Sequence, residues 1–214
     1  MLLLKANQLS TELDSPPCYE NVPGNHFDKY ASRNPIVRSL MSGFMAALDD
    51  LVALAHPSRA YEVGCGEGLL SLHLSHRGVK VTGSDVDPDI IAKANRHFDT
   101  PVFSVQSIFD LQAGQITADL LLCCEVMEHL PDPKRALKVL RSQNATFYVL
   151  SVPREPLWRI LNLVRGAYIK SLGNTPGHIQ HWNKRAFCSL LSSDFEILAV
   201  RTPLPWTMVL AKKK

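Results

Sequence analysis

The chain has 214 residues, of which 46% are hydrophobic and 20% charged, and its formal net charge is +3. That length fits one domain with a full hydrophobic core, and the composition excludes a disordered or fibrous protein. The slight positive charge, partly in the lysines at 212–214, does not predict a nucleic-acid partner. The five cysteines lack C-x-x-C spacing, so we expect neither disulfides nor a zinc–thiolate site, and we expect a cytoplasmic protein.

Residues 1–25 are predicted to form an irregular arm, because they include three prolines and many polar side chains. Their apolar start is too short for a signal sequence or a membrane span. We assign residues 26–214 to a single domain. Within it, apolar residues recur at helical spacing over 35–55, where Pro35 suits a first helical position and His56 and Pro57 form a stop.

After this helix, short apolar or β-branched runs alternate with helical patterns. The predicted strands are 59–63, 79–84, 102–106, 118–123 and 146–151, and the predicted helices between them are 69–76, 88–98 and 134–141. This alternation is typical of a parallel sheet with helices on both faces. Two further strand-like runs, 195–201 and 206–211, predict a terminal antiparallel hairpin, and the stretch 153–192 is predicted to be an insertion that builds a substrate pocket or lid.

A glycine-rich loop lies where the first predicted strand turns into a helix. Its sequence, E-V-G-C-G-E-G over 62–68, allows a bound ligand to approach the backbone closely. Leu69 stands where a dinucleotide fingerprint would need its last glycine, so a pyrophosphate cradle is not expected. Asp85 ends the second predicted strand, where a carboxylate can accept hydrogen bonds from both hydroxyls of a ribose.

The order E-x-G-x-G-x-G, G-x-D at 83–85 and E-V-M-E-H-L-P-D-P at 125–133 resembles class I S-adenosylmethionine-dependent methyltransferases, in particular a bacterial group near the ubiquinone-biosynthesis O-methyltransferases. The resemblance implies a Rossmann-like doubly wound sheet of seven strands, mostly parallel, and S-adenosylmethionine as cofactor. It places Glu62 and Gly64 beside the methionyl part of the cofactor, Gly66 beneath it and Asp85 at the ribose. The other cofactor contacts that we expect are Tyr30, Cys65, Val86, Cys124 and, at the adenine, Ser107 and Ile108.

The run after the fourth predicted strand has the pattern E-x-x-E-H, formed by Glu125, Glu128 and His129. If a helical turn begins after Cys124, these three side chains share one face. The pattern is similar to that of metal-dependent RNA 2′-O-methyltransferases, and that resemblance adds His178 as a fourth ligand. The donor set would suit Mg²⁺, Mn²⁺ or Fe²⁺, which would lower the pKa of a substrate hydroxyl.

The same pattern also occurs in methyltransferases for which no metal is implied. In that alternative, His129 or His178 is the candidate general base, because histidine titrates near neutral pH, and Glu125 is a further candidate catalytic residue.

We expect methyl transfer to a hydroxyl of a small molecule, lipid-like or aromatic, with Trp158 and Trp182 as candidate walls of its pocket. Two alternatives remain open: a metal-dependent RNA 2′-O-methyltransferase, and a catalytically inactive regulatory protein that binds the cofactor. The basic, apolar run 156–172 is either a lid packed on the sheet or a peripheral membrane contact.

Overall fold

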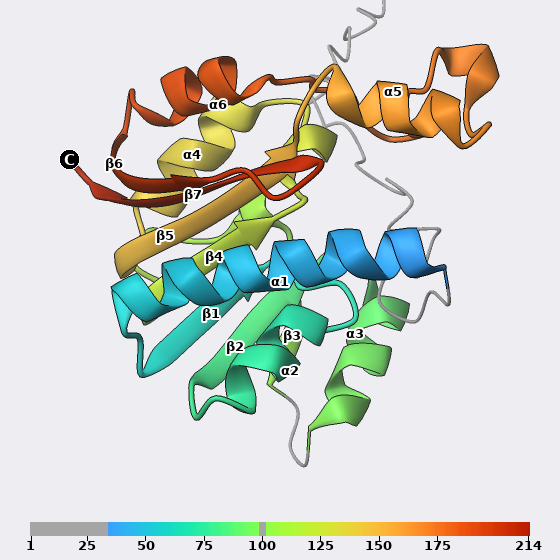
Figure 1. Ribbon diagram of the computed structural model, residues 1–214. Helices are drawn as coiled ribbons and strands as arrows, with labels where there is room; N and C mark the ends of the chain where they lie inside the picture. The colour runs from blue at the N-terminus through green and yellow to red at the C-terminus, as the bar shows by residue number, and fades with distance from the viewer. Residues whose placement is uncertain (1–33, 99–101) are drawn as a thin grey trace, which may run out of the picture.

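The computed structural model describes residues 34–98 and 102–214, in which a single seven-stranded sheet is flanked by helices (Figure 1). The predicted arm, 1–25, and Tyr30 lie outside the described residues. The strands are β1 (Arg59–Val63), β2 (Lys80–Asp85), β3 (Phe103–Val105), β4 (Thr117–Cys124), β5 (Asn144–Pro153), β6 (Phe195–Arg201) and β7 (Trp206–Lys213). The helices are α1 (Pro35–Ala55), α2 (Leu69–Ser75), α3 (Pro88–Ala94), α4 (Pro133–Arg141), α5 (Leu157–Val164) and α6 (Lys184–Leu191), with short 3-10 turns η1 (Asn95–His97), η2 (Ile108–Asp110), η3 (Met127–His129) and η4 (Ile169–Ser171).

The strand order is β3-β2-β1-β4-β5-β7-β6. The first five strands run parallel, whereas β7 inserts antiparallel between β5 and β6. This confirms the predicted fold class, including the terminal hairpin. The carboxyl ends of the parallel strands therefore meet at one edge, which is where ligands bind in folds of this kind.

The two faces of the sheet carry separate hydrophobic clusters because side chains alternate along each strand. Leu120 and Leu122 of β4 share a buried cluster with α1 and α2. Leu121 and Cys123 point to the other face and share a cluster with α4 and α6. Among the described residues, no helix is both long and apolar enough to cross a membrane.

The stretch 153–192 contains two parts with different roles. Its last part is α6, a helix that sequence patterning missed, and Phe187 and Leu191 of α6 are fully buried against the sheet. α6 therefore belongs to the helical layer that every fold of this type needs. The remaining part, α5 and η4 with the loops around them, extends beyond the sheet (Figure 1).

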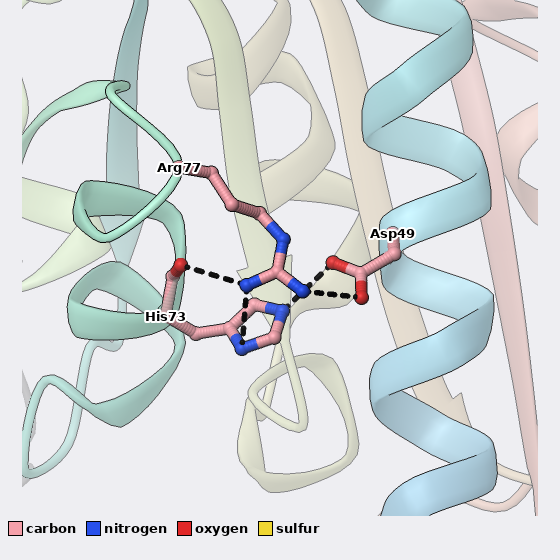
Figure 2. A network of polar contacts seen from close by, with 3 residues as sticks. All are labelled: Asp49, His73 and Arg77. Carbon is pink, nitrogen blue, oxygen red and sulfur yellow. Dashed lines mark hydrogen bonds and ion pairs between the residues drawn. The ribbon is translucent and has the colours of Figure 1, made fainter.

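A polar network holds α1 against α2, as Figure 2 shows. Arg77 donates to Oδ2 of Asp49 at 2.9 Å and also lies 3.2 Å from Nδ1 of His73. Since an arginine can only donate, Nδ1 is an acceptor, and Nε2 of His73 donates its proton to Oδ1 of Asp49 at 2.7 Å. The network therefore fixes the later part of α1 against the end of α2.

The close spacing of β1 and β2 predicts that alanine substitution affects stability differently at Gly83 and at Gly43. A Cβ on Gly83 would lie 2.5 Å from the backbone oxygen of Glu62, whereas a Cβ on Gly43, exposed in α1, would meet nothing within 4 Å. We expect Gly83→Ala to lower the free energy of unfolding by about 1–3 kcal/mol, and Gly43→Ala to raise it by up to about 1 kcal/mol. Urea denaturation of both variants measures this, and equal effects of the two changes would contradict the sheet spacing.

Candidate active site

The loop between β1 and α2 is held by a carboxyl group from inside β1. α2 begins after Gly68, which has no side chain to cap the helix. Oε2 of Glu62 takes that role: it accepts hydrogen bonds from the backbone N–H of Ser71 at 3.1 Å and from its hydroxyl at 2.6 Å. Burial raises the pKa of Glu62 to about 8, because the charged form loses its hydration, and the hydrogen bonds from Ser71 only partly oppose this.

Two glycines of this loop have different surroundings. Gly64 has φ +70°, and a Cβ there would lie 2.3 Å from Val126, so the loop packs directly on the turn that follows β4. Gly66 has φ +53°, and a Cβ there would meet nothing within 4 Å. The backbone at Gly66 therefore borders open space that a ligand can fill without steric hindrance.

Asp85, at the end of β2, is tied to the same loop. Its Oδ2 accepts from the N–H of Gly66 at 2.9 Å, and its Oδ1 accepts from the N–H of Asp87 at 3.2 Å. The N–H groups of Gly64 and Cys65 donate to the carbonyl of Ser84, which brings the loop onto the end of β2. The half-exposed carboxylate of Asp85 consequently faces the same open space as Gly66.

These groups line a cavity of about 840 Å³. Every predicted cofactor residue within the described chain lines it, namely Glu62, Gly64, Cys65, Gly66, Asp85, Val86, Ser107, Ile108 and Cys124. Burial raises the pKa of the Cys65 thiol and that of the Cys124 thiol, so neither is a thiolate near neutral pH. Both cysteines shape the cavity without offering a nucleophile.

Glu125 does not join the predicted cluster of ligands, which corrects the sequence prediction. Its φ is +59°, so the chain leaves β4 through a left-handed residue rather than through a helical turn, and the helical 3-10 turn η3 starts only at Met127. The Glu125 carboxylate accepts from the indole N–H of Trp206 at 2.6 Å and from the hydroxyl of Ser151 at 3.4 Å. It anchors β7 and β5 to the end of β4.

Glu128, His129 and His178 do come together: one ligand atom from each lies within 4.8 Å of the others. Backbone hydrogen bonds cause this, because the N–H groups of Ile179 and Gln180 both donate to the carbonyl of Glu128 at 3.0 Å. Nδ1 of His129 lies 2.9 Å from the carbonyl of Gly177, which can only accept, so Nδ1 carries the proton. The lone pair of His129 is therefore on Nε2.

Aromatic side chains continue from this cluster along the cavity. Trp158 of α5 stacks on His178 at 5.7 Å and also lies 5.7 Å from Trp206, which in turn meets the edge of Phe44 of α1 at 5.1 Å. The candidate wall Trp158 is thus part of the cavity, whereas Trp182 packs on Phe187 in the core.

Sequence reasoning missed Trp206 and the α1 side of the cavity. The lining residues on that side are Ile36, Val37, Leu40, Met41 and Phe44. Their helical spacing indicated only a face packed on the sheet, and no local pattern marked Trp206 as part of a site. These residues, together with Trp158 and Trp206, give the cavity a largely apolar part, which we call its apolar half.

A family model described as a methyltransferase domain matches residues 37–200. The chain belongs to this methyltransferase domain family. It is 35% identical over 123 residues to a ubiquinone biosynthesis O-methyltransferase of Xanthomonas campestris pv. campestris (strain B100), a match that covers 54% of this chain and 52% of that protein. The counterpart from Xanthomonas oryzae pv. oryzae (strain PXO99A) is 34% identical over the same share. The match therefore spans about half the length of these curated relatives.

Solved structures confirm the fold of the methyltransferase domain. Magnesium protoporphyrin IX methyltransferase from Synechocystis PCC 6803, solved with bound SAH, superposes with a TM-score of 0.63 at 20% identity, covering 86% of this chain and 89% of that one. The 16S rRNA methylase RmtB superposes with a TM-score of 0.56 at 20% identity, covering 84% of this chain and 65% of that one. Because these two proteins are named for a porphyrin and an rRNA, the fold alone does not decide the substrate.

The raised pKa of Glu62 predicts how stability depends on pH. Its pKa is about 8 in the folded protein and about 4.5 when exposed, so its contribution to stability is fully present below about pH 4.5 and is lost as the pH rises through about 8. Over this window the loss approaches about 1.4 kcal/mol per pH unit. We expect Glu62→Gln to reduce the change of the free energy of unfolding with pH, which urea denaturation at a series of pH values measures.

Glu196→Gln is the control for this prediction, because Glu196 lies on the outer strand β6, where its carboxylate pairs with Lys212 on the surface. It is expected to keep the slope of the wild-type protein. An unchanged slope in Glu62→Gln would show that Glu62 does not hold its proton at neutral pH.

Proposed function

We propose that this methyltransferase domain transfers a methyl group from S-adenosylmethionine to a hydroxyl group of a small molecule. The observation that carries the proposal is a single cavity that runs from Gly66 and Asp85 to His129 and His178. It offers a polar end beside a glycine loop and an apolar end beside two tryptophans. Its volume of about 840 Å³ has room for a nucleoside cofactor together with a small substrate.

The polar end fits the cofactor by its own chemistry. Asp85 offers a carboxylate that can accept from both ribose hydroxyls, and Gly66 leaves room for the ligand against its backbone. Ser107 and Ile108, just after β3, line the side where the family resemblance puts the adenine. When bound, S-adenosylmethionine supplies an electrophilic methyl group that an oxygen nucleophile takes by direct displacement.

His129 and His178, at the other end of the cavity, supply the general base and orient the substrate. Nε2 of His129 carries the lone pair and can accept the proton of a substrate hydroxyl as its oxygen bonds to the methyl carbon. The carbonyl of Gly177 then stabilises the imidazolium through Nδ1, which keeps its proton throughout. His178, held between His129 and Trp158, orients the substrate. The names of the curated relatives, O-methyltransferases, support oxygen as the acceptor atom.

The cluster also fits a divalent cation, with a ligand set different from the one that the sequence pattern predicts. The ligand set is one carboxylate, from Glu128, and two imidazoles, from His129 and His178. Glu125 is not in this group, and its carboxylate accepts a hydrogen bond from Trp206. Such a set suits Mn²⁺ or Fe²⁺ better than Mg²⁺, which prefers oxygen ligands. A bound ion would lower the pKa of a substrate hydroxyl and reduce the work left to a base.

The same cluster favours a second candidate, a metal-dependent RNA 2′-O-methyltransferase, because the resemblance to those enzymes rests on these residues. The apolar lining contributed by α1 and α5 favours the small molecule, since a ribose and its phosphates would leave it without contacts. A catalytically inactive cofactor-binding regulator is the third alternative, and it predicts cofactor binding without turnover.

Substitution of Asp85 tests the cofactor end. We expect the wild-type protein to bind S-adenosylhomocysteine in calorimetric titration and Asp85→Asn to bind it at least about tenfold more weakly, because a charged hydrogen-bond acceptor is lost. Asp89→Asn, an exposed change in the first turn of α3, is the control and should keep the wild-type affinity. No binding by the wild-type protein would contradict the proposal.

Mn²⁺ binding followed by electron paramagnetic resonance tests the ligand set. After treatment with a chelator, we expect the protein to bind added Mn²⁺, and Glu128→Gln and His178→Gln to weaken that binding at least about tenfold. Glu125→Gln should leave the affinity unchanged, because that carboxylate lies outside the cluster. Loss of Mn²⁺ binding in Glu125→Gln would restore the four-ligand set, and no binding by the wild-type protein would leave His129 to act as a base alone.

A further inference from the structure

The segment 156–193 has a one-sided charge. It contains no aspartate or glutamate, whereas Arg159, Arg165, Lys170, Lys184 and Arg185 all lie within it. The nearest acidic residues are Glu155 and Asp194, at its two borders. The absence of negative charge along this run favours contact with an anionic surface wherever its cations are exposed.

The first part of this segment also exposes apolar side chains. Of the twelve large hydrophobic residues that are exposed in the described chain, five lie on α5, η4 and the residue after η4. They are Ile160 (50% exposed), Leu163 (41%), Val164 (80%), Ile169 (63%) and Leu172 (68%). We name residues 157–172 the α5–η4 surface, and Figure 1 shows it projecting from the rest of the molecule.

Hydrogen bonds between side chains and backbone hold the α5–η4 surface to the loop that follows it. The side-chain amide of Asn162, which is 3% exposed, donates to the carbonyl of Gly173 at 2.8 Å and to the hydroxyl of Thr175 at 3.1 Å. Nε of Arg159 donates to the carbonyl of Leu172 at 3.1 Å. Asn162 and Arg159 thus pair within the α5–η4 surface and the loop after it, whereas the five apolar side chains are exposed.

The α5–η4 surface contributes part of the cavity wall. Leu161, Val164, Arg165 and Tyr168 line the cavity from this side, and Ile36, which is 68% exposed at the start of α1, lines it as well. A layer of apolar molecules that covered the α5–η4 surface would therefore contact Val164, a residue that also lines the cavity.

We propose that the α5–η4 surface docks on a membrane that contains anionic phospholipids. The apolar side chains of Ile160, Val164 and Ile169 enter the boundary of the acyl chains, while Arg165 and Lys170 bind headgroup phosphates. A second copy of this chain fits less well, because a two-fold interface on this surface would bring Arg165 and Lys170 of one copy close to the same cations of the other. This docking does not depend on the proposed methyl transfer.

Flotation with two kinds of vesicle tests the proposal: phosphatidylcholine alone, and phosphatidylcholine with phosphatidylglycerol. We expect the protein to bind the anionic vesicles at least about tenfold more strongly, and the binding to weaken with salt. Ile160→Glu combined with Ile169→Glu should lower this affinity at least about tenfold, because two charges then oppose insertion. Arg165→Gln and Lys170→Gln should each lower it about fivefold.

The control is Leu198→Glu, a change of the same kind at a residue 41% exposed on β6, which should keep the wild-type affinity for vesicles. Neither Ile160 nor Ile169 lines the cavity, so the double variant should bind S-adenosylhomocysteine as the wild-type protein does, and vesicle binding and cofactor binding are separate results. Equal vesicle binding by the double variant and the control would overturn the proposal. So would an absence of binding to both vesicles, or a dimer in size-exclusion chromatography that the double variant abolishes.

Discussion

The geometry of the site depends on one buried carboxyl group, that of Glu62, which lies in β1 but serves the first turn of α2. Its hydrogen bonds from Ser71 replace the cap that Gly68 does not supply, so the end of the strand and the start of the helix keep a set distance. Asp85 holds the middle of the same loop from β2 through the N–H of Gly66. Because the loop is held on both sides, the backbone of Gly66 is fixed where it lines the cavity.

The polar half of the cavity could be predicted from the sequence because its determinants are local. A glycine loop between a strand and a helix, and an acidic residue at the end of the next strand, meet in any parallel sheet whose strands end at one edge. The expected place of Glu125 on one face with Glu128 and His129 was wrong for an equally local reason. The prediction assumed a helical turn after Cys124, and a single left-handed residue, φ +59° at Glu125, turns that side chain toward β7 instead.

The apolar half could not be predicted in the same way, because contacts between distant segments create it. The spacing of α1 indicated a buried face, yet the same face also lines the cavity beyond the edge of the sheet. His178 reaches His129 only because the backbone of 179–180 pairs with the carbonyl of Glu128, a contact that periodicity does not encode. The approach of His178 to His129 was implied by a family resemblance, and these backbone hydrogen bonds explain it physically.

The two halves of the cavity are built on supports of different kinds, and this bears on how such a domain can change its substrate. Strand ends hold the groups around Asp85, whereas α1, α5 and the loop before Ile179 hold the walls of the other half. A substitution in α5 can alter those walls while the bonds at Glu62 and Asp85 stay as they are. The hydrogen bond from Trp206 to Glu125 joins an aromatic wall of the apolar half to the end of β4, next to Val126, on which the glycine loop packs. A substitution of Trp206 that altered the substrate would therefore also disturb the cofactor half.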